Sequence, residues 1–569
     1  MQSSHADLHA AAHVAALTKR RGRAGVSLRK SQGSHYTPIS LVAYLTEEVL
    51  RGRPVGASMR VLDPACGTGN FLVHAAREMY ARGSKREHSS RALAHILSTN
   101  IFGIDIDAQA VLIARARLLE LVAHETRAVR MSVSRALAAH VRVQDAMEPR
   151  AWSKPFDAPF DVILGNPPFL SQLKRGTVAS RERARLIASA TGGAVRRYSD
   201  LSAAFLLVSL DRLAQHGRLG FVMPLSFLST GDASDARCKA RSVASLRALW
   251  SCDESIFEAA SVRVAALVFE RASLKRSAPL RRTFGVDFHE LPPISRDEVR
   301  AATDSAHATW APLLGDAFGA PRALAMISRD APTIGMYARA TADFRDQYYG
   351  LRGMIAESRD ATTHARGSSS ALPAHALLTT KHIGLARCDW GLCPVRIHAE
   401  KFTMPRVEVA RFEADSPMRG WIAARSVPKI LVATQTKAME AWVDARGVAV
   451  PLVPLLTVTP LRAEDLWLVA AAVASPVVAA RAIAQFTGSA LSAGAIKLSA
   501  RQLLAMPAPC DRALWQQSAS LFREASNART QAARRTALER FGQASCAAHG
   551  LSGRDRDEML RFWLQRADL

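Results

Sequence analysis

The sequence predicts an α/β protein in which a doubly wound, mostly parallel sheet is followed by a mixed α/β domain and a helical tail. Between residues 61 and 169, four apolar runs of strand character end in a carboxylate or an amide, and helical segments separate them. Farther along, short apolar runs are interrupted by Gly and Pro, and residues 511–569 have helical spacing. The polar ends of parallel strands meet at one edge of a sheet, so we expect a ligand site there.

The first strand, Val61–Asp63, leads into a glycine loop and then a helix. Gly67 and Gly69 allow a ligand to approach the backbone, but Leu72 stands where a dinucleotide-binding fingerprint has its third glycine. A nicotinamide dinucleotide is therefore disfavoured. Asp63, at the start of the loop, instead suits a ligand with a positive ammonium group, such as S-adenosylmethionine.

Carboxylates also follow the second and third strands. Asp105 follows the run Ile101–Ile104 and can accept from both hydroxyls of a ribose. Asp107 precedes a helical segment, so we expect it to cap that helix. Asp145 follows the strand Val141–Val143, and we expect it to accept from the adenine amine of the cofactor.

The fourth strand, Phe160–Gly165, ends in Asn166-Pro167-Pro168-Phe169. Asn166 offers a side-chain carbonyl, and Pro167 fixes the backbone without donating a hydrogen, so several acceptors can converge on an exocyclic amine. Phe169 can lie against the flat face of the base that carries this amine. The simpler alternative is a strand that ends in a turn, because Pro-Pro stops strands and Asn is common in turns.

In this order the motifs resemble those of the gamma class of DNA adenine-N6 methyltransferases, the TaqI-like enzymes and the methylation subunits of type I systems. Gly33–Pro38 is similar to the family's amino-terminal cofactor motif, and residues 217–224, 255–257 and 263–269 match its late strands. The resemblance implies that S-adenosylmethionine is bound by Tyr36, Thr37, Pro38, Asp63, Pro64, Ala65, Gly67, Gly69, Asp105, Ile106, Asp145 and Asn166. It also implies that the target adenine is held by Asn166, Pro167, Pro168 and Phe169, with Phe257 as a second stacking ring. A place in the core is the alternative for Phe257.

The implied activity is site-specific transfer of a methyl group to the N6 amine of a flipped adenine in duplex DNA. This activity suits the modification component of a restriction-modification or phage-defence system. We identify no nuclease constellation after Arg271, so we expect a separate nuclease, specificity subunit or defence partner, or action alone. One alternative is a methyltransferase of another planar amine, in ribosomal RNA guanine or release-factor glutamine. The other is an inactive DNA-binding subunit that uses the fold as a scaffold.

Composition bounds the remaining possibilities. The 569 residues carry a formal net charge of +25, which favours salt-dependent binding to polyanions such as DNA. The seven cysteines are scattered, and we expect reduced thiols. His382, Cys388, Cys393 and His398 lack the paired spacing of structural zinc motifs, so we expect no metal. No apolar run reaches membrane-spanning length, from which we expect a cytoplasmic protein without a membrane partner.

The chain divides into five expected segments. These are a basic lead-in at 1–31, an S-adenosylmethionine-dependent methyltransferase domain at 32–271, a connector at 272–343, a target-recognition domain at 344–510 and a helical tail at 511–569. In the recognition domain, the aromatic and basic side chains that we expect to be available for DNA contact are Trp390, Trp421, Arg425, Lys429 and Lys437. Trp442 stands in an apolar run, so we expect it in the core.

Overall fold

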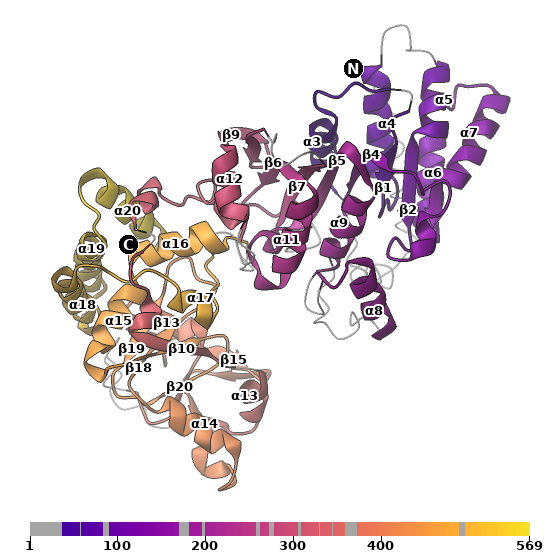
Figure 1. Ribbon diagram of the computed structural model, residues 1–569. Helices are drawn as coiled ribbons and strands as arrows, with labels where there is room; N and C mark the ends of the chain where they lie inside the picture. Colours follow the sequence, from indigo (N-terminus) through magenta and orange to yellow (C-terminus); the bar gives the residue numbers. More distant parts are fainter. Residues whose placement is uncertain are drawn as a thin grey trace. The chain divides into compact units, whose positions relative to one another are not determined.

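The computed structural model describes residues 37–56, 58–83, 90–169, 181–195, 200–257, 262–271, 278–304, 309–328, 330–343, 345–358, 372–488 and 495–569 (Figure 1). The chain forms two compact units, Met1–Trp310 and Ala311–Leu569. The basic lead-in at 1–31 and Tyr36 lie outside the described residues.

The first unit is built on a nine-stranded sheet with the order β3-β2-β1-β4-β5-β7-β6-β8-β9. Its strands are β1 (Val61–Asp63), β2 (Ile101–Asp105), β3 (Val141–Val143), β4 (Phe160–Gly165), β5 (Leu213–Pro224), β6 (Ser245–Ser251), β7 (Val264–Glu270), β8 (Leu280–Phe284) and β9 (His289–Ile294). Strands β3, β2, β1, β4 and β5 run parallel, and β7 is antiparallel to both β5 and β6. The strand order reverses between β1 and β4, as it does at the ligand-binding edge of doubly wound sheets. The predicted fold class is confirmed.

Helices of the first unit connect these strands, and short polar residues mark several of their starts. The helices are α3 (Ile39–Leu50), α4 (Asn70–Arg82), α5 (Ser90–Thr99), α6 (Ala108–Glu120), α7 (Arg127–His140), α8 (Arg181–Ala190), α9 (Leu201–Asp211), α10 (Ser226–Ser229), α11 (Ser234–Val243) and α12 (Arg296–Thr303). Asp107 caps α6 by accepting from the backbone N–H groups of Gln109 and Ala110, which confirms its predicted capping role.

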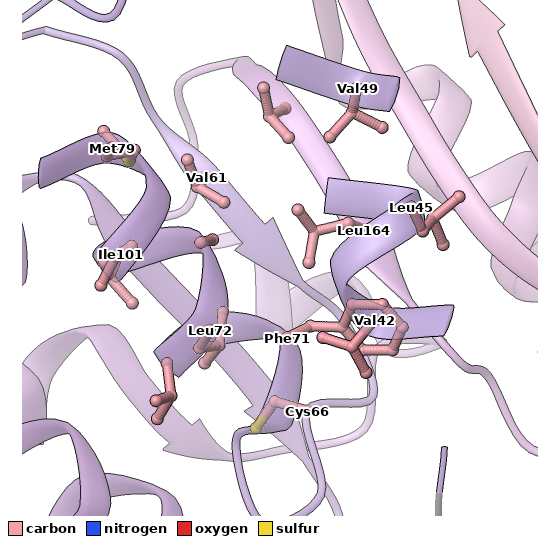
Figure 2. Close-up of a cluster of buried hydrophobic side chains, with 14 of the residues drawn as sticks. Val42, Leu45, Val49, Val61, Cys66, Phe71, Leu72, Met79, Ile101 and Leu164 are labelled. Atoms are coloured by element: carbon pink, nitrogen blue, oxygen red, sulfur yellow. The ribbon is translucent and has the colours of Figure 1, made fainter. Parts of the chain in front are cut away.

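Helix α3 packs on the sheet through an apolar face. Figure 2 shows Val42, Leu45 and Val49 of α3 in one cluster with Phe71 of α4 and Leu164 of β4. The three α3 side chains are at most 1% exposed, so this face is completely removed from water. Burial of α3 fixes the start of the helix, and with it the two residues that precede it, beside the end of β4.

The central sheet continues past residue 271. Strands β8 and β9 pair with each other, and β8 also pairs in parallel with β6. Two strands of the segment expected to be a connector are therefore part of the sheet. The same segment contains helix α12, at whose start Ser295 and Glu298 form a capping box.

The second unit contains two four-stranded sheets, ordered β10-β21-β18-β19 and β11-β17-β12-β20, and two hairpins, β13-β14 and β15-β16. The strands are β10 (Ala338–Ala342), β11 (Ile355–Glu357), β12 (Ala376–Leu378), β13 (Ile383–Gly384), β14 (Arg387–Cys388), β15 (Val395–Ile397), β16 (Glu400–Phe402), β17 (Pro405–Val407), β18 (Lys429–Val432), β19 (Ala441–Asp444), β20 (Ala449–Pro451) and β21 (Leu456–Pro460). The helices are α13 (Arg345–Gly350), α14 (Pro417–Arg425), α15 (Leu466–Val473), α16 (Pro476–Phe486), α17 (Ala500–Leu504), α18 (Arg512–Asn527), α19 (Gln531–Ala548) and α20 (Gly553–Arg566).

Helices α18, α19 and α20 form the end of the chain, where the sequence predicts a helical tail. Trp515, Phe541 and Trp563 are buried in this part of the unit, so its helices pack against other elements through apolar faces. Within the part of the chain that the structure describes, no single helix is long and apolar enough to cross a membrane. The bent pair formed by 463–473 and 476–486 meets the length and composition criteria only when its two helices are taken together.

Candidate functional site

The polar residues singled out in the sequence stand at the carboxyl ends of four neighbouring strands. Asp63 is the last residue of β1 and Asp105 the last of β2, while Asn166 directly follows β4. Asp145 lies just beyond β3. Because these strands pair in parallel, their polar ends share one edge of the sheet, next to the reversal of strand order between β1 and β4.

Asp63 joins the glycine loop to the end of β4. Its Oδ1 accepts from the backbone N–H of Ala65 at 3.0 Å, and its side chain is only 1% exposed. The carboxylate also lies against the backbone of Gly165, where an added Cβ would stand 2.6 Å from Oδ1. Burial raises the pKa of Asp63 well above its usual range, although the Ala65 hydrogen bond opposes this shift. The glycine before Asn166 is thus required by a close approach that sequence reasoning did not identify.

Asp105 holds the glycine loop against β2. Its Oδ2 accepts from the N–H of Gly67 at 2.8 Å, and its Oδ1 accepts from the N–H of Asp107 at 2.8 Å. Burial raises the pKa of Asp105, while these backbone hydrogen bonds lower it. The next residue, Ile106, is 63% exposed despite its apolar side chain. An apolar surface therefore lies immediately beside a carboxylate.

Asp145 is ion-paired with an arginine from helix α8. Arg183 Nη2 donates to Asp145 Oδ1 at 3.2 Å, and its Nη1 contacts Oδ2. Asp145 Oδ1 also accepts from the backbone N–H of Met147 at 2.9 Å. The ion pair joins residues 38 positions apart, and sequence reasoning did not anticipate it.

Asn166 is contacted by Thr37, two residues before the start of α3. Its Nδ2 donates to Thr37 Oγ1 at 2.9 Å, across a separation of 129 residues, and Thr37 is 5% exposed. Pro38 directly precedes α3, and its carbonyl accepts from the N–H groups of Leu41 and Val42. Thr37 and Asn166, which belong to two separate predicted site segments, are thus brought together.

Two aromatic rings lie beside the Asn166 segment. Phe169 and Phe257 have ring centroids 6.3 Å apart at an angle of 63°, which is an edge-to-face arrangement. They are 9% and 5% exposed, and both belong to the apolar cluster under the site. The structure brings these two predicted stacking residues together although they are far apart in the sequence.

The remaining predicted site residues belong to the same strand ends. Pro64 and Ala65 follow Asp63 in the loop, and Gly69 precedes α4 with a left-handed φ of 82°. Pro167 is buried and Pro168 is half-buried beyond Asn166. Roles for these residues in binding a cofactor or a base stay predictions.

Several residues expected to contact DNA in the second unit are instead held by internal partners. Trp390 is 4% exposed and Lys429 is 0% exposed, so availability is wrong for both. Trp421 Nε1 and Arg425 Nη2 both donate to Asp343 Oδ1, at 3.0 and 2.6 Å. Lys437 remains exposed, and Trp442 is 1% exposed, which confirms its core position.

The histidine and cysteine cluster near residue 390 is engaged by the backbone. His382 Nδ1 accepts from the N–H of Thr379 at 3.2 Å, and its Nε2 lies 3.3 Å from the carbonyl of Cys393. Burial lowers the His382 pKa to about 4, which keeps the ring neutral. Among the described residues, no group of three or more His, Cys, Asp or Glu side chains is arranged to hold a metal ion. None of the seven cysteines, all of which lie within the described residues, forms a disulfide.

Comparison with known proteins links the first unit to DNA methylases. Residues 11–289 match the N-6 DNA Methylase family. The chain is similar to the Type II methyltransferase M.VspI of Vibrio sp. (strain 343), with 28% identity over 216 residues, 37% of this chain and 41% of that protein. It is also similar to the adenine-specific methyltransferase BrxX of Escherichia coli O9:H4 (strain HS), with 37% identity over 73 residues, 13% of this chain and 6% of that protein. The chain spans less than half the length of these curated relatives.

One solved structure resembles nearly the whole chain. The Type IIL restriction-modification enzyme MmeI, determined in complex with DNA, matches with a TM-score of 0.60 and 15% identity. The likeness covers 95% of this chain and 79% of that one. At this identity the similarity concerns the fold.

Proposed function

Because residues 11–289 match the N-6 DNA Methylase family, we propose that this protein transfers a methyl group from S-adenosylmethionine to the N6 amine of an adenine flipped out of duplex DNA. The observation that carries the proposal is the hydrogen bond from Asn166 Nδ2 to Thr37 Oγ1. With Nδ2 directed at Thr37, Oδ1 is the atom that the amide presents to an amine. Asn166 therefore acts as an acceptor at the edge of the sheet where ligands of this fold bind.

The residues around the glycine loop fit S-adenosylmethionine by their chemistry. Each oxygen of Asp105 accepts one backbone N–H, and a carboxylate has about four acceptor positions, so capacity remains for two ribose hydroxyls. Exposed Ile106 offers an apolar face for the adenine ring. Asp63 brings a buried carboxyl group to the loop, and the positive charge of a bound ammonium group would lower its raised pKa and favour the ionised form. Bound there, the cofactor supplies an electrophilic methyl group.

The chain's own residues then activate the target amine and hold the base. The lone pair of an adenine amine is delocalised into the ring, so the amine is a weak nucleophile. Asn166 Oδ1 and the Pro167 carbonyl accept hydrogen bonds from this amine, and such bonds favour a tetrahedral nitrogen. Phe169 and Phe257 stack against the extruded base, which offsets part of the cost, a few kcal/mol, of flipping it. Alignment of the amine with the methyl group supplies the rest of the rate enhancement.

We also propose that the protein is the modification component of a restriction-modification or phage-defence system. The resemblance to M.VspI and the high net positive charge support this role. Residues 344–510 would then recognise the DNA target, alone or with a separate specificity subunit, nuclease or defence partner.

The test is transfer of a labelled methyl group by the full chain to duplex DNA, structured RNA and a release factor in parallel. We expect label only in DNA, recovered as N6-methyladenine. Asn166→Ala should abolish transfer while cofactor affinity changes by less than about twofold, because Asn166 acts on the amine. Asp105→Ala should weaken cofactor binding first. Label in RNA or protein but not in DNA overturns the proposal, and cofactor and DNA binding without any transfer identifies an inactive scaffold.

A further inference from the structure

Strands β15 and β16 of the second unit form an antiparallel hairpin (Figure 1 labels β15). Its register pairs Val395 with Phe402 and Arg396 with Lys401. The turn residues His398 and Ala399 have positive φ values of 50° and 74°. Two consecutive left-handed residues form the tight turn whose twist suits an antiparallel hairpin, so the register of the two strands is fixed.

One face of the hairpin is anchored in the core. Val395, Ile397 and Phe402 are 3%, 1% and 9% exposed and belong to one apolar cluster. Because side chains alternate along a strand, Arg396 and Lys401 lie on the opposite face, and both are exposed. The anchored face holds the two cations in place.

These two cations face each other across the hairpin. Cross-strand partners have Cβ atoms about 5 Å apart, and like charges at that spacing destabilise a hairpin. Neither Arg396 nor Lys401 forms an ion pair within the described part of the chain. Other exposed arginines of the unit do pair, such as Arg411 with Glu408. A conflict with local rules on an otherwise well-formed element is typical of a functional position.

Aromatic and basic side chains adjoin the turn. The ring of Tyr348 lies 4.3 Å from that of His398, and its hydroxyl accepts from the His398 N–H at 3.3 Å. Arg352 is near enough to contribute, after burial, to a lowered pKa of His398. Tyr349, which packs against Tyr348, is 60% exposed. The region beside the turn therefore combines aromatic rings with a further cation, as nucleic-acid-binding surfaces do, and with one carboxylate, Glu400.

We propose that hairpin β15-β16 enters the major groove of duplex DNA and that Arg396 and Lys401 contact phosphates at the groove's edge. A two-stranded ribbon fits the width of this groove. The DNA backbone carries a negative charge about every 1.7 Å along its axis, so bound phosphates cancel the repulsion between the paired cations. The inference rests on the proposed function for the identity of the polyanion. It concerns equilibrium binding, which does not require methyl transfer.

The test measures binding of the full chain to a labelled duplex of mixed sequence by fluorescence anisotropy over a range of salt concentrations. Arg396→Gln combined with Lys401→Gln should make the dependence of log affinity on log salt shallower by about 2, close to one for each phosphate that is no longer neutralised. Affinity near physiological salt should fall by about tenfold or more. The control with an equal change of charge combines Arg411→Gln and Arg535→Gln, whose arginines pair with Glu408 and Glu539. The control double variant should change the slope of log affinity against log salt by less than half of the change expected for the hairpin double variant.

Arg396→Glu separates binding from folding. The new carboxylate stands opposite Lys401 and can form a cross-strand ion pair, so the melting temperature should stay constant or rise while DNA affinity falls. Equal slopes for the hairpin and control double variants overturn the proposal. It is also overturned if affinity falls only together with the melting temperature, or if the substitutions weaken binding to duplex RNA but leave binding to duplex DNA intact. If the hairpin substitutions weaken DNA binding as expected but the wild-type chain transfers no methyl group, only the proposed activity is refuted.

Discussion

Replacing Gly165 with alanine tests the contact that joins the end of β4 to Asp63. The new Cβ would lie 2.6 Å from Asp63 Oδ1 and 3.1 Å from its Cγ, so one of the two groups must move. Asp63 cannot turn away at little cost, because it is 1% exposed and its Oδ1 is held by the N–H of Ala65. Overpacking of this kind costs about 1–3 kcal/mol, and a buried N–H left unsatisfied costs about as much.

Thermal unfolding and calorimetric titration of S-adenosylmethionine measure the two consequences. For a domain of this size, about 1–3 kcal/mol corresponds to a lower melting temperature by roughly 2–12 °C. Cofactor affinity should fall as well, because the displaced Asp63 no longer supports the glycine loop. The matched control is Gly56→Ala, since a Cβ at Gly56 meets nothing within 4 Å. It should leave both measurements nearly unchanged.

A double-mutant cycle with Asp63→Ala isolates the cause. The nearest atoms to the new Cβ all belong to the Asp63 carboxylate, which this substitution removes. In that background Gly165→Ala should cost little further stability, and the coupling energy should be similar in size to the single-variant loss. If Gly165→Ala costs as much without the carboxylate as with it, the contact is not the source of the strain.

Three other substitutions test positions whose partners are given by the structure. Thr37→Val should lower the turnover number about tenfold by removing the acceptor of Asn166 Nδ2, with Thr37→Ser near wild type; a changed cofactor KM with an unchanged turnover number would contradict this positioning role. Lys429→Met leaves the Asp444 carboxylate buried without its cation, so urea unfolding should show a loss of about 3–5 kcal/mol, and a loss below about 1 kcal/mol would contradict the importance of the pair. Burial raises the pKa of Glu440 to about 7, so the folded state binds more protons than the unfolded state between about pH 4.5 and 7, and stability falls as pH rises through that window. Glu440→Gln should therefore gain stability relative to wild type from pH 5 to pH 8, by at most about 3 kcal/mol, and a difference independent of pH would refute this account.

The strands of the first unit could be predicted because their signals are local. Each of Val61–Asp63, Ile101–Asp105 and Phe160–Gly165 is a short, mainly apolar run, and a polar residue or a proline stands at or directly after its end. The same locality explains the boundary that differed. The residues of Leu280–Phe284 do not indicate that this run pairs with β6, so the sequence prediction assigned a strand of the central sheet to the connector.

The second unit shows why residue type alone did not identify exposed cations. Lys429 and Arg425 carry the charge expected of DNA contacts, but Asp444 and Asp343 hold them inside the unit. A basic side chain is available only when no acid reaches it, and that depends on the fold. The first strand of the hairpin did leave a signal in the sequence, because Val395–Ile397 alternates apolar and charged residues, but the consecutive charges Glu400 and Lys401 interrupt the alternation in the second strand.

The carboxylates at the edge of the first sheet differ in what they can offer a ligand. Asp63 is enclosed by Gly165 and the loop, and its Oδ1 already accepts from the N–H of Ala65. Asp145 is bound by Arg183, yet a carboxylate can accept from more donors than an arginine and one backbone N–H provide. If the adenine amine of the cofactor binds Asp145, as we propose, it can do so without displacing Arg183, and the guanidinium would then lie beside that adenine. Arg183 should then increase cofactor affinity, so Arg183→Ala should weaken binding, whereas tighter binding would mean that the arginine competes with the cofactor for Asp145.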